Sequence, residues 1–156
     1  MKHLPTHPRT LLFAPAVRPD LVAKLPTSSP DVVAIDLEDA TPLNAKDEAR
    51  DALTSLVDQV YGKVPVTVRI NPVDSPWFED DVAALPEGLA AVLVPKIETR
   101  EGLDLVAAAF HTAGKHDLQI VAGLETALGV ADSRDLLTHP VVAGCYFGAE
   151  DFIADM

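Results

Sequence analysis

Residues 32–70 read VVAIDLEDATPLNAKDEARDALTSLVDQVYGKVPVTVRI, and this stretch decides the fold class. The almost continuous apolar run Val32–Leu37 is typical of a parallel strand that is buried on both faces. The segment Asn44–Tyr61 then repeats apolar residues along one helical stripe, with Asn44 placed to cap its amino end. A second apolar strand follows at Val66–Ile70. The stretch therefore predicts a strand–helix–strand unit with a right-handed crossover.

The same alternation extends over the rest of the chain. Four further apolar runs are expected to be strands: Thr10–Ala16, Ala90–Val94, Leu118–Ala122 and Val141–Phe147. Helices are expected at Arg100–Ala113, after a Thr99 cap and before Gly114, and at Ala127–Leu137. Six strand–helix units predict an α/β fold. Two closures compete, an open doubly wound sheet and most of a TIM-type (β/α)8 barrel, which typically takes about 250 residues.

Composition excludes several classes of function. The 156 residues carry 24 Asp plus Glu against 12 Lys plus Arg, a net charge of -12, with no basic run. Such a chain repels phosphate backbones, so we expect no nucleic-acid partner. No apolar run approaches the ~20 residues of a membrane span, no apolar signal segment opens the sequence, and Cys145 is the one cysteine. We therefore expect one domain over residues 1–156, no membrane contact and a cytoplasmic location.

Ionisable side chains gather where the predicted strands end. In chain order they are Arg18, then Asp36, Glu38 and Asp39, then Arg69, then Lys96 and Glu98, then Glu125, then Glu150 and Asp151. In a parallel barrel these ends meet at one face, which is where the active site lies. For any single carboxylate the alternative is a helix cap or a solvated loop charge.

A family resemblance extends from about Arg9 to the last residue. The chain contains, in order, LLFAPAVRPD, AIDLEDATP followed by Lys46 and Arg50, VRINP, VPKIET, LETALGV and FGAEDF. This series resembles the citrate lyase β-subunit-like family, within the HpcH/HpaI aldolases and malyl-CoA lyases. The resemblance implies a TIM-type barrel, of which this chain covers about the first six units. It also implies an Mg²⁺-dependent (or Mn²⁺-dependent) carbon–carbon lyase that forms a trimer or hexamer.

The implied substrate is a β-hydroxyacyl-CoA of the citryl, malyl or citramalyl type, cleaved to an acyl-CoA and an oxo acid. By position, the resemblance implies that Glu125 and Asp151 are the two protein ligands of the metal. Mg²⁺ prefers octahedral oxygen ligands and commonly takes one or two carboxylates, with water or substrate filling the rest. The ion would stabilise the negative charge that develops on the oxo acid. A capping role is the alternative for Glu125.

The catalytic residues implied by the resemblance are Arg69, Glu38 and Asp39. Arg69 is similar to a family arginine that binds substrate oxygens, and an ion pair with Glu38 or Asp39 is the alternative. Glu38 and Asp39 match an acidic pair that orients Arg69 and the metal's waters. Asp36 is then expected to be structural.

The positively charged residues Arg9, Arg18 and Lys24 fall near family positions associated with CoA phosphates and the substrate rim, and surface charge is their alternative. The family usually has Gly after the first-strand Pro, whereas Ala16 follows Pro15 here, so the approach of CoA or substrate backbone is expected to differ. The general acid/base resembles an aspartate that falls beyond Met156 in the family pattern and comes from another subunit.

Lys96 suggests a competing mechanism, because a lysine at a strand end can form an imine with an oxo acid. Neighbouring carboxylates raise a lysine pKa and oppose this, so we expect Lys96 to be salt-bridged. Two other functions stay open: a CoA-independent pyruvate-type aldolase, and a truncated chain that binds metal or ligand without catalysis.

Overall fold

The computed structural model describes residues 3–156, and within this range six parallel strands form one sheet. The strands are β1 (Leu11–Pro15), β2 (Val32–Asp36), β3 (Val66–Arg69), β4 (Ala91–Val94), β5 (Ile120–Leu124) and β6 (Val142–Phe147). Their order in the sheet is β1-β2-β3-β4-β5-β6, the same as their order in the chain. All six predicted strands are present. The largest difference is in β5, which begins and ends two residues later than predicted.

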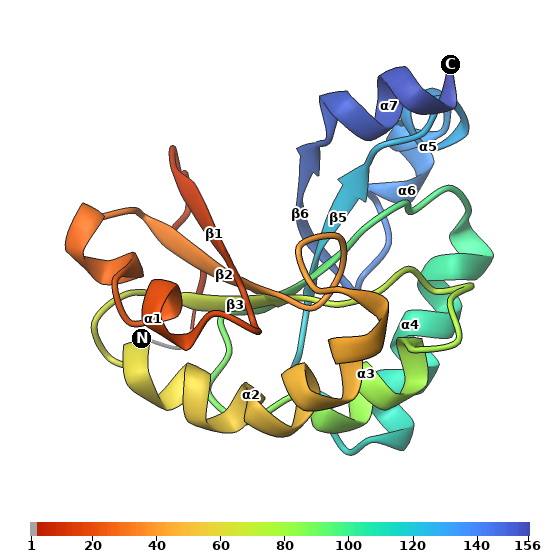
Figure 1. The fold of residues 1–156 in the computed structure, drawn as a ribbon. Helices are drawn as coiled ribbons and strands as arrows, with labels where there is room; N and C mark the ends of the chain where they lie inside the picture. Colours follow the sequence, from red (N-terminus) through yellow and green to blue (C-terminus); the bar gives the residue numbers. More distant parts are fainter. Residues whose placement is uncertain (1–2) are drawn as a thin grey trace.

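Helical segments connect successive strands, and one more, α7, follows the last strand. They are α1 (Pro19–Val22), η1 (Leu25–Ser28), η2 (Leu43–Ala45), α2 (Lys46–Val60), α3 (Phe78–Ala84), α4 (Arg100–Thr112), α5 (Ala127–Ala131), α6 (Ser133–Leu136) and α7 (Ala149–Asp155). Figure 1 shows α2, α3 and α4 side by side below the sheet, with α5, α6 and α7 gathered near β5 and β6. A doubly wound sheet would reverse its strand order at a switch point, and this sheet does not.

Two details of the helices differ from expectation. Asn44 does not cap α2, because it lies inside the tight turn η2, which is closed by a hydrogen bond from the Ala45 N–H to the Pro42 carbonyl. The predicted helix Ala127–Leu137 is divided into α5 and α6 at Asp132, whose carbonyl begins a new turn. The Thr99 cap is confirmed, since its Oγ1 accepts the Gly102 N–H at 3.1 Å.

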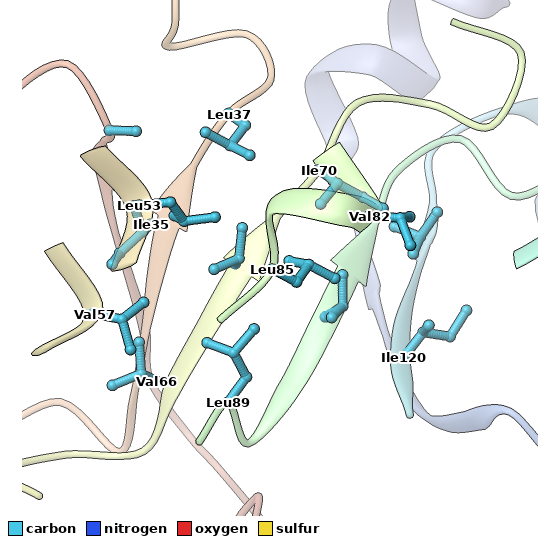
Figure 2. Packing of buried hydrophobic residues seen from close by; sticks show 14 of the residues in the cluster. Ile35, Leu37, Leu53, Val57, Val66, Ile70, Val82, Leu85, Leu89 and Ile120 are labelled. Atoms are coloured by element: carbon cyan, nitrogen blue, oxygen red, sulfur yellow. The ribbon is translucent and has the colours of Figure 1, made fainter. Parts of the chain in front are cut away.

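The main core lies between the sheet and the helices. Figure 2 shows Leu53 and Val57 of α2 reaching toward Ile35 and Val66 of the sheet, and Val82 of α3 close to Ile70. All of these side chains are buried. Each buried side chain of this size contributes about 1.5–3 kcal/mol, so this layer fixes α2 and α3 against the strands.

The opposite face of the sheet carries the polar residues. Asp36 lies opposite Arg69 in the β2–β3 register, and Gly123 lies opposite Tyr146 in the β5–β6 register. Residues opposite each other in a parallel ladder point to the same face, so these strands present a common inner surface. In the described part of the chain the sheet is not closed, because β1 and β6 each pair on one side only.

Candidate functional site

Asp36 and Arg69 form the centre of a polar cluster at the carboxyl ends of the strands. Arg69 Nε donates to Asp36 Oδ1 at 2.8 Å, and Nη2 donates to Oδ2 at 2.6 Å. The buried Asp36 carboxylate also accepts the backbone N–H of Glu38 at 2.9 Å and of Ala40 at 3.2 Å. Asp36 therefore has the geometry of a structural residue and is the bidentate partner of Arg69, which also forms the expected ion pair with Glu38.

Glu38 joins this pair to the next strand end. Its Oε1 accepts a hydrogen bond from Lys96 Nζ at 2.8 Å, and its Oε2 lies 3.0 Å from Arg69 Nη1. Burial raises the pKa of Glu38, although the charges of Lys96 and Arg69 oppose this. Asp39 is more peripheral, with its side chain 59% exposed and its Oδ2 3.7 Å from Arg69 Nη1. Glu38 thus lies between two cations, while Asp39 lies at the rim.

Lys96 connects the acidic loop after β2 to both residues of the implied metal pair. Its Nζ lies 3.6 Å from Asp151 Oδ1, and its backbone N–H donates to Glu125 Oε2 at 3.2 Å. Burial lowers the pKa of Lys96, but the hydrogen bond and charge of Glu38 outweigh it, so the pKa is raised. The expected salt-bridged lysine is confirmed. A protonated amine of this kind does not attack a carbonyl.

The backbone of Lys96 is in the left-handed region, with φ of 52°. A non-glycine residue held there costs of order 1–3 kcal/mol, and such residues cluster at functional sites. At Lys96 this conformation aims the N–H at Glu125 while the side chain reaches Glu38.

Glu125 is buried at the end of β5, and Gly148 makes room for it. A Cβ at Gly148 would lie 2.5 Å from Glu125 Cγ and 2.8 Å from Cδ, so a larger residue would displace the carboxylate. Burial raises the pKa of Glu125, and the nearby charge of Asp151 adds to this. Asp151, near the start of α7, is partly exposed. The two carboxylates therefore come from different elements and converge where Lys96 contacts both.

This donor set suits a hard divalent cation. In residues 3–156 no group of three or more His, Cys, Asp or Glu side chains is arranged to hold a metal ion. Zinc sites normally need at least three such ligands, whereas Mg²⁺ is often held by one or two carboxylates with water and substrate oxygens. Glu125 and Asp151 are the residues that could hold it.

Tyr146 is a member of the cluster that the sequence analysis missed. Its hydroxyl is buried and finds no hydrogen-bond partner among the described residues. Gly123, opposite it on β5, leaves room for the ring, because a Cβ there would lie 2.7 Å from the hydroxyl oxygen. Burial raises the pKa of Tyr146, and the charge of Glu125 raises it further, so the phenol stays protonated. Because side chains alternate along a strand, the sequence could have predicted that Tyr146 and Gly144 of β6 share a face. It could not have predicted that this face is the polar one.

The three expected CoA-binding cations lie outside this cluster. Arg18 and Lys24 follow the carboxyl end of β1, and the Arg18 guanidinium is bound to Asp20 at 2.8 and 2.9 Å. Arg9 precedes β1, so it lies at the opposite end of that strand from Arg18, and its side chain is 88% exposed. That position differs from the expectation that Arg9 borders the substrate rim, because the rim is formed by the carboxyl ends of the strands.

Known proteins resemble this chain over nearly its whole length. Residues 9–156 match the family described as HpcH/HpaI aldolase/citrate lyase. The chain belongs to this family. The expected family and barrel-type fold are thereby confirmed, and the sheet corresponds to part of a TIM-type barrel.

Three relatives illustrate the match. A citrate lyase subunit beta-like protein of Deinococcus radiodurans is 44% identical over 153 residues, covering 95% of this chain and 54% of that protein. The citrate lyase beta subunit of M. tuberculosis complexed with oxaloacetate and magnesium is 32% identical with a TM-score of 0.75, covering 93% of this chain and 60% of that one. The Mycobacterium tuberculosis CitE complex with magnesium, acetoacetate and coenzyme A is 30% identical with a TM-score of 0.74, covering 97% and 52%.

The chain spans about half the length of the curated relatives it matches. The family comprises carbon–carbon lyases and aldolases, so the expected enzyme class is confirmed at the level of the family. Over residues 3–156, none of the helices has the length and apolar character needed to cross a membrane.

Proposed function

We propose that this protein is an Mg²⁺-dependent carbon–carbon lyase that cleaves a β-hydroxyacyl-CoA into an acyl-CoA and an oxo acid. One observation carries the proposal: the carboxylates of Glu125 and Asp151 converge at Lys96, and through Glu38 this group is joined to Arg69. An oxo acid has adjacent oxo and carboxylate oxygens. A cation held by the two carboxylates, together with the fixed guanidinium beside them, would bind these oxygens.

The residues present fit the metal. Gly148 leaves the space that the Glu125 carboxylate occupies. Burial and the nearby charge of Asp151 raise the pKa of Glu125, and a bound cation would oppose both effects. Bound between Glu125 and Asp151, Mg²⁺ would supply a Lewis acid for the oxygens of the oxo acid. Relatives solved with magnesium and oxaloacetate support this assignment.

Arg69 is the group best placed to hold the substrate carboxylate. A guanidinium has five N–H donors, and Arg69 uses two of them, on Nε and Nη2, to bind both oxygens of Asp36. We call this pair of hydrogen bonds the Asp36–Arg69 fork. The second hydrogen of Nη2 remains for another anion, while Nη1 lies 3.0 Å from Glu38 Oε2, so a substrate carboxylate would share Nη1 with Glu38. Because Asp36 fixes the plane of the guanidinium, Arg69 loses little conformational freedom when it binds.

The bond-breaking step needs charge stabilisation and two proton transfers, one from the β-hydroxyl to a general base and one from the resulting acid to the enolate. The family resemblance implies that this acid/base group comes from another subunit. The β-hydroxyl loses its proton and becomes the oxo group, the adjacent C–C bond breaks, and its electron pair moves onto the α-carbon of the thioester. That acyl-CoA enolate then takes up a proton. Arg69 and the protonated Lys96 supply positive charge beside the oxo-acid half, in a partly buried site where it is most effective.

The proposal has further parts that follow the family resemblance. The chain forms one lyase domain over residues 1–156, and the protein works as a homo-oligomer in the cytoplasm. Arg18 follows the carboxyl end of β1 and Lys24 follows α1, so they are better candidates for the CoA phosphates than Arg9, which lies at the other end of β1.

The test is a substrate panel with metal titration on the protein at its natural length. Malyl-, citramalyl- and citryl-CoA are supplied with Mg²⁺, and acyl-CoA and oxo acid are measured by chromatography. Calorimetric Mg²⁺ binding is then compared in wild type, Glu125→Gln and Asp151→Asn, with Glu150→Gln as the matched control because it is exposed and adjacent to Asp151.

We expect cleavage of one thioester, loss of most turnover in Glu125→Gln and Asp151→Asn, and wild-type behaviour of Glu150→Gln. Equal Mg²⁺ binding in all four proteins would remove the metal assignment. Aldol cleavage of oxo-acid substrates without any CoA requirement would instead favour the pyruvate-type aldolase.

A further inference from the structure

Lys46 is a buried lysine that binds the loop carrying Glu38. Its side chain is at the first position of α2, and the residue is 3% exposed. Nζ donates to the carbonyl oxygen of Leu37 at 2.5 Å, to that of Glu38 at 2.8 Å and to Asn71 Oδ1 at 2.7 Å. An ammonium group has three N–H donors, so every one of them has a partner.

Two oppositely charged side chains bind the backbone of this loop, one through its N–H groups and the other through its carbonyl groups. The Asp36 carboxylate accepts the N–H groups of Glu38 and Ala40, and the Lys46 ammonium donates to the carbonyls of Leu37 and Glu38. The backbone of Glu38 is therefore bound at both its N–H and its C=O. With both groups fixed, the Glu38 side chain is directed toward Arg69 and Lys96.

The same ammonium group ties this loop to the strand that carries Arg69. Asn71, two residues after Arg69, accepts from Lys46 and donates through Nδ2 to Asp81 Oδ2 at 2.6 Å. Asp81 is fully buried on α3, and its Oδ1 accepts from Arg50 Nη1 of α2 at 3.0 Å. The network therefore fixes the end of β2 against the end of β3, which sets the distance between Glu38 and Arg69.

The charge of Lys46 is balanced within the network. Burial lowers the pKa of Lys46, while the carboxylates of Asp81 and Asp36 oppose this. The Trp77 ring lies 5.5 Å from Nζ and covers the ammonium group, an arrangement that favours a cation. Within residues 3–156, Lys46 Nζ makes no hydrogen bond to the Glu38, Arg69 or Lys96 side chains, and it reaches the site through backbone carbonyls and Asn71.

We propose that Lys46 is a positioning residue of the active site, which holds the Glu38 carboxylate at the correct distance from Arg69 for oxo-acid binding. The proposal rests on the proposed function, since it assigns Lys46 to the oxo-acid half of that site. A side chain without a donor at this position leaves the buried Asn71 Oδ1 unpaired and removes one of the two donors of each carbonyl, since Leu37 keeps Asn71 Nδ2 and Glu38 keeps the Thr41 N–H. The tie between the ends of β2 and β3 is lost, and the loop must rearrange.

The test compares Lys46→Met with Lys63→Met. Methionine keeps most of the length of lysine but has no donor, and Lys63, at the other end of α2, is an exposed lysine that donates to one carbonyl, that of Gln59. Mg²⁺ binding and then pyruvate binding in saturating Mg²⁺ are measured by calorimetry, with stoichiometry and Kd reported separately. We expect Lys46→Met to weaken pyruvate binding at least tenfold at unchanged stoichiometry, to change the Mg²⁺ Kd less than threefold, and Lys63→Met to match wild type.

A merely structural lysine would give a different pattern. Loss of folded protein lowers the stoichiometry of both ligands together and leaves each Kd unchanged, and that result would overturn the proposal. If Lys46→Met does not fold, Lys46→Gln replaces it, because its shorter, neutral side chain has two N–H donors for the three acceptors and must release at least one of them. Wild-type pyruvate affinity in folded Lys46→Gln would equally overturn the proposal. If wild type itself binds neither Mg²⁺ nor pyruvate, the proposed function fails instead.

Discussion

Replacing Gly148 by alanine should weaken Mg²⁺ binding strongly while it changes the stability of the fold only a little. The Gly148 backbone has φ of −93°, which any residue adopts, so alanine brings no backbone strain. The added Cβ, however, would lie 2.5 Å from Glu125 Cγ and 2.8 Å from Cδ, where ordinary contacts begin at 3.4 Å. The Glu125 carboxylate must therefore move by about 1 Å.

A shift of this size has a large effect on binding and a modest one on stability. Misplacing a functional group by about 1 Å costs up to ~100-fold, and disturbing the support of a metal ligand costs ~10–100-fold in affinity. We therefore expect Gly148→Ala to weaken Mg²⁺ binding by ~10–100-fold, or about 1.4–2.7 kcal/mol. Overpacking costs ~1–3 kcal/mol, partly offset by the ~0.4–1 kcal/mol that a Gly→Ala change contributes through the unfolded chain.

The assay is calorimetric Mg²⁺ titration together with thermal unfolding. Gly144→Ala is the matched control, because Gly144 is on β6 just before this turn and a Cβ there meets no atom within 4 Å. Wild-type Mg²⁺ affinity in Gly148→Ala would refute the steric argument. Equal affinity in Glu125→Gln as well would refute the ligand assignment itself.

Three further predictions follow from ion pairs and hydrogen bonds. Asp36→Asn removes the bidentate partner of the Arg69 guanidinium, which then keeps Glu38 as its buried anion, and should lower the free energy of unfolding by ~3–5 kcal/mol in urea titrations. A change below ~1 kcal/mol would contradict the importance of this ion pair. The hydrogen bond from the Arg9 backbone N–H lowers the pKa of Asp31 below its ordinary value of 3.8. Ionised Asp31 therefore stabilises the fold above pH 3.8, and this stabilisation is lost as the pH falls through the lowered pKa of the folded state. The stability difference between wild type and Asp31→Asn should therefore shrink from about pH 5 to about pH 2, and a constant difference would count against it. Borohydride with pyruvate should trap no adduct on Lys96, because the carboxylates beside it keep the amine protonated; a reduced adduct found by mass spectrometry would establish imine chemistry.

Strand positions were predictable because burial on both faces leaves a strong local signal. Runs such as Val32–Leu37 and Val66–Ile70 are apolar at nearly every position, and both became strands. The limits of β5 were less clear, because the predicted strand ended at Ala122, before a glycine, which weakens strand preference, although Gly123 lies in the strand opposite Tyr146. Asn44 was an ordinary capping residue by type, but the preceding Pro42 set a tight turn that local preference does not reveal.

The site was predictable only as far as strand ends determine it. Topology brings the carboxyl ends of parallel strands together, which is why Glu125 and Arg69 could be assigned to one cluster. The choice of Asp36 as the partner of Arg69 depends on the register of β2 against β3. Asp81 comes from one face of α3, and the space beside Gly148 depends on how two elements pack, so no pattern in the sequence distinguishes them.

The strand order has a consequence for how the chain acquires its site during synthesis. Each new strand pairs with the one completed just before it, so no earlier strand has to wait for a later one to be inserted beside it. The Asp36–Arg69 fork is complete once β3 has emerged, whereas the carboxylate pair needs Asp151, more than eighty residues later by the numbering of the sequence. Because a domain generally folds as a unit, the two halves of the site are assembled together only after Asp151 has emerged.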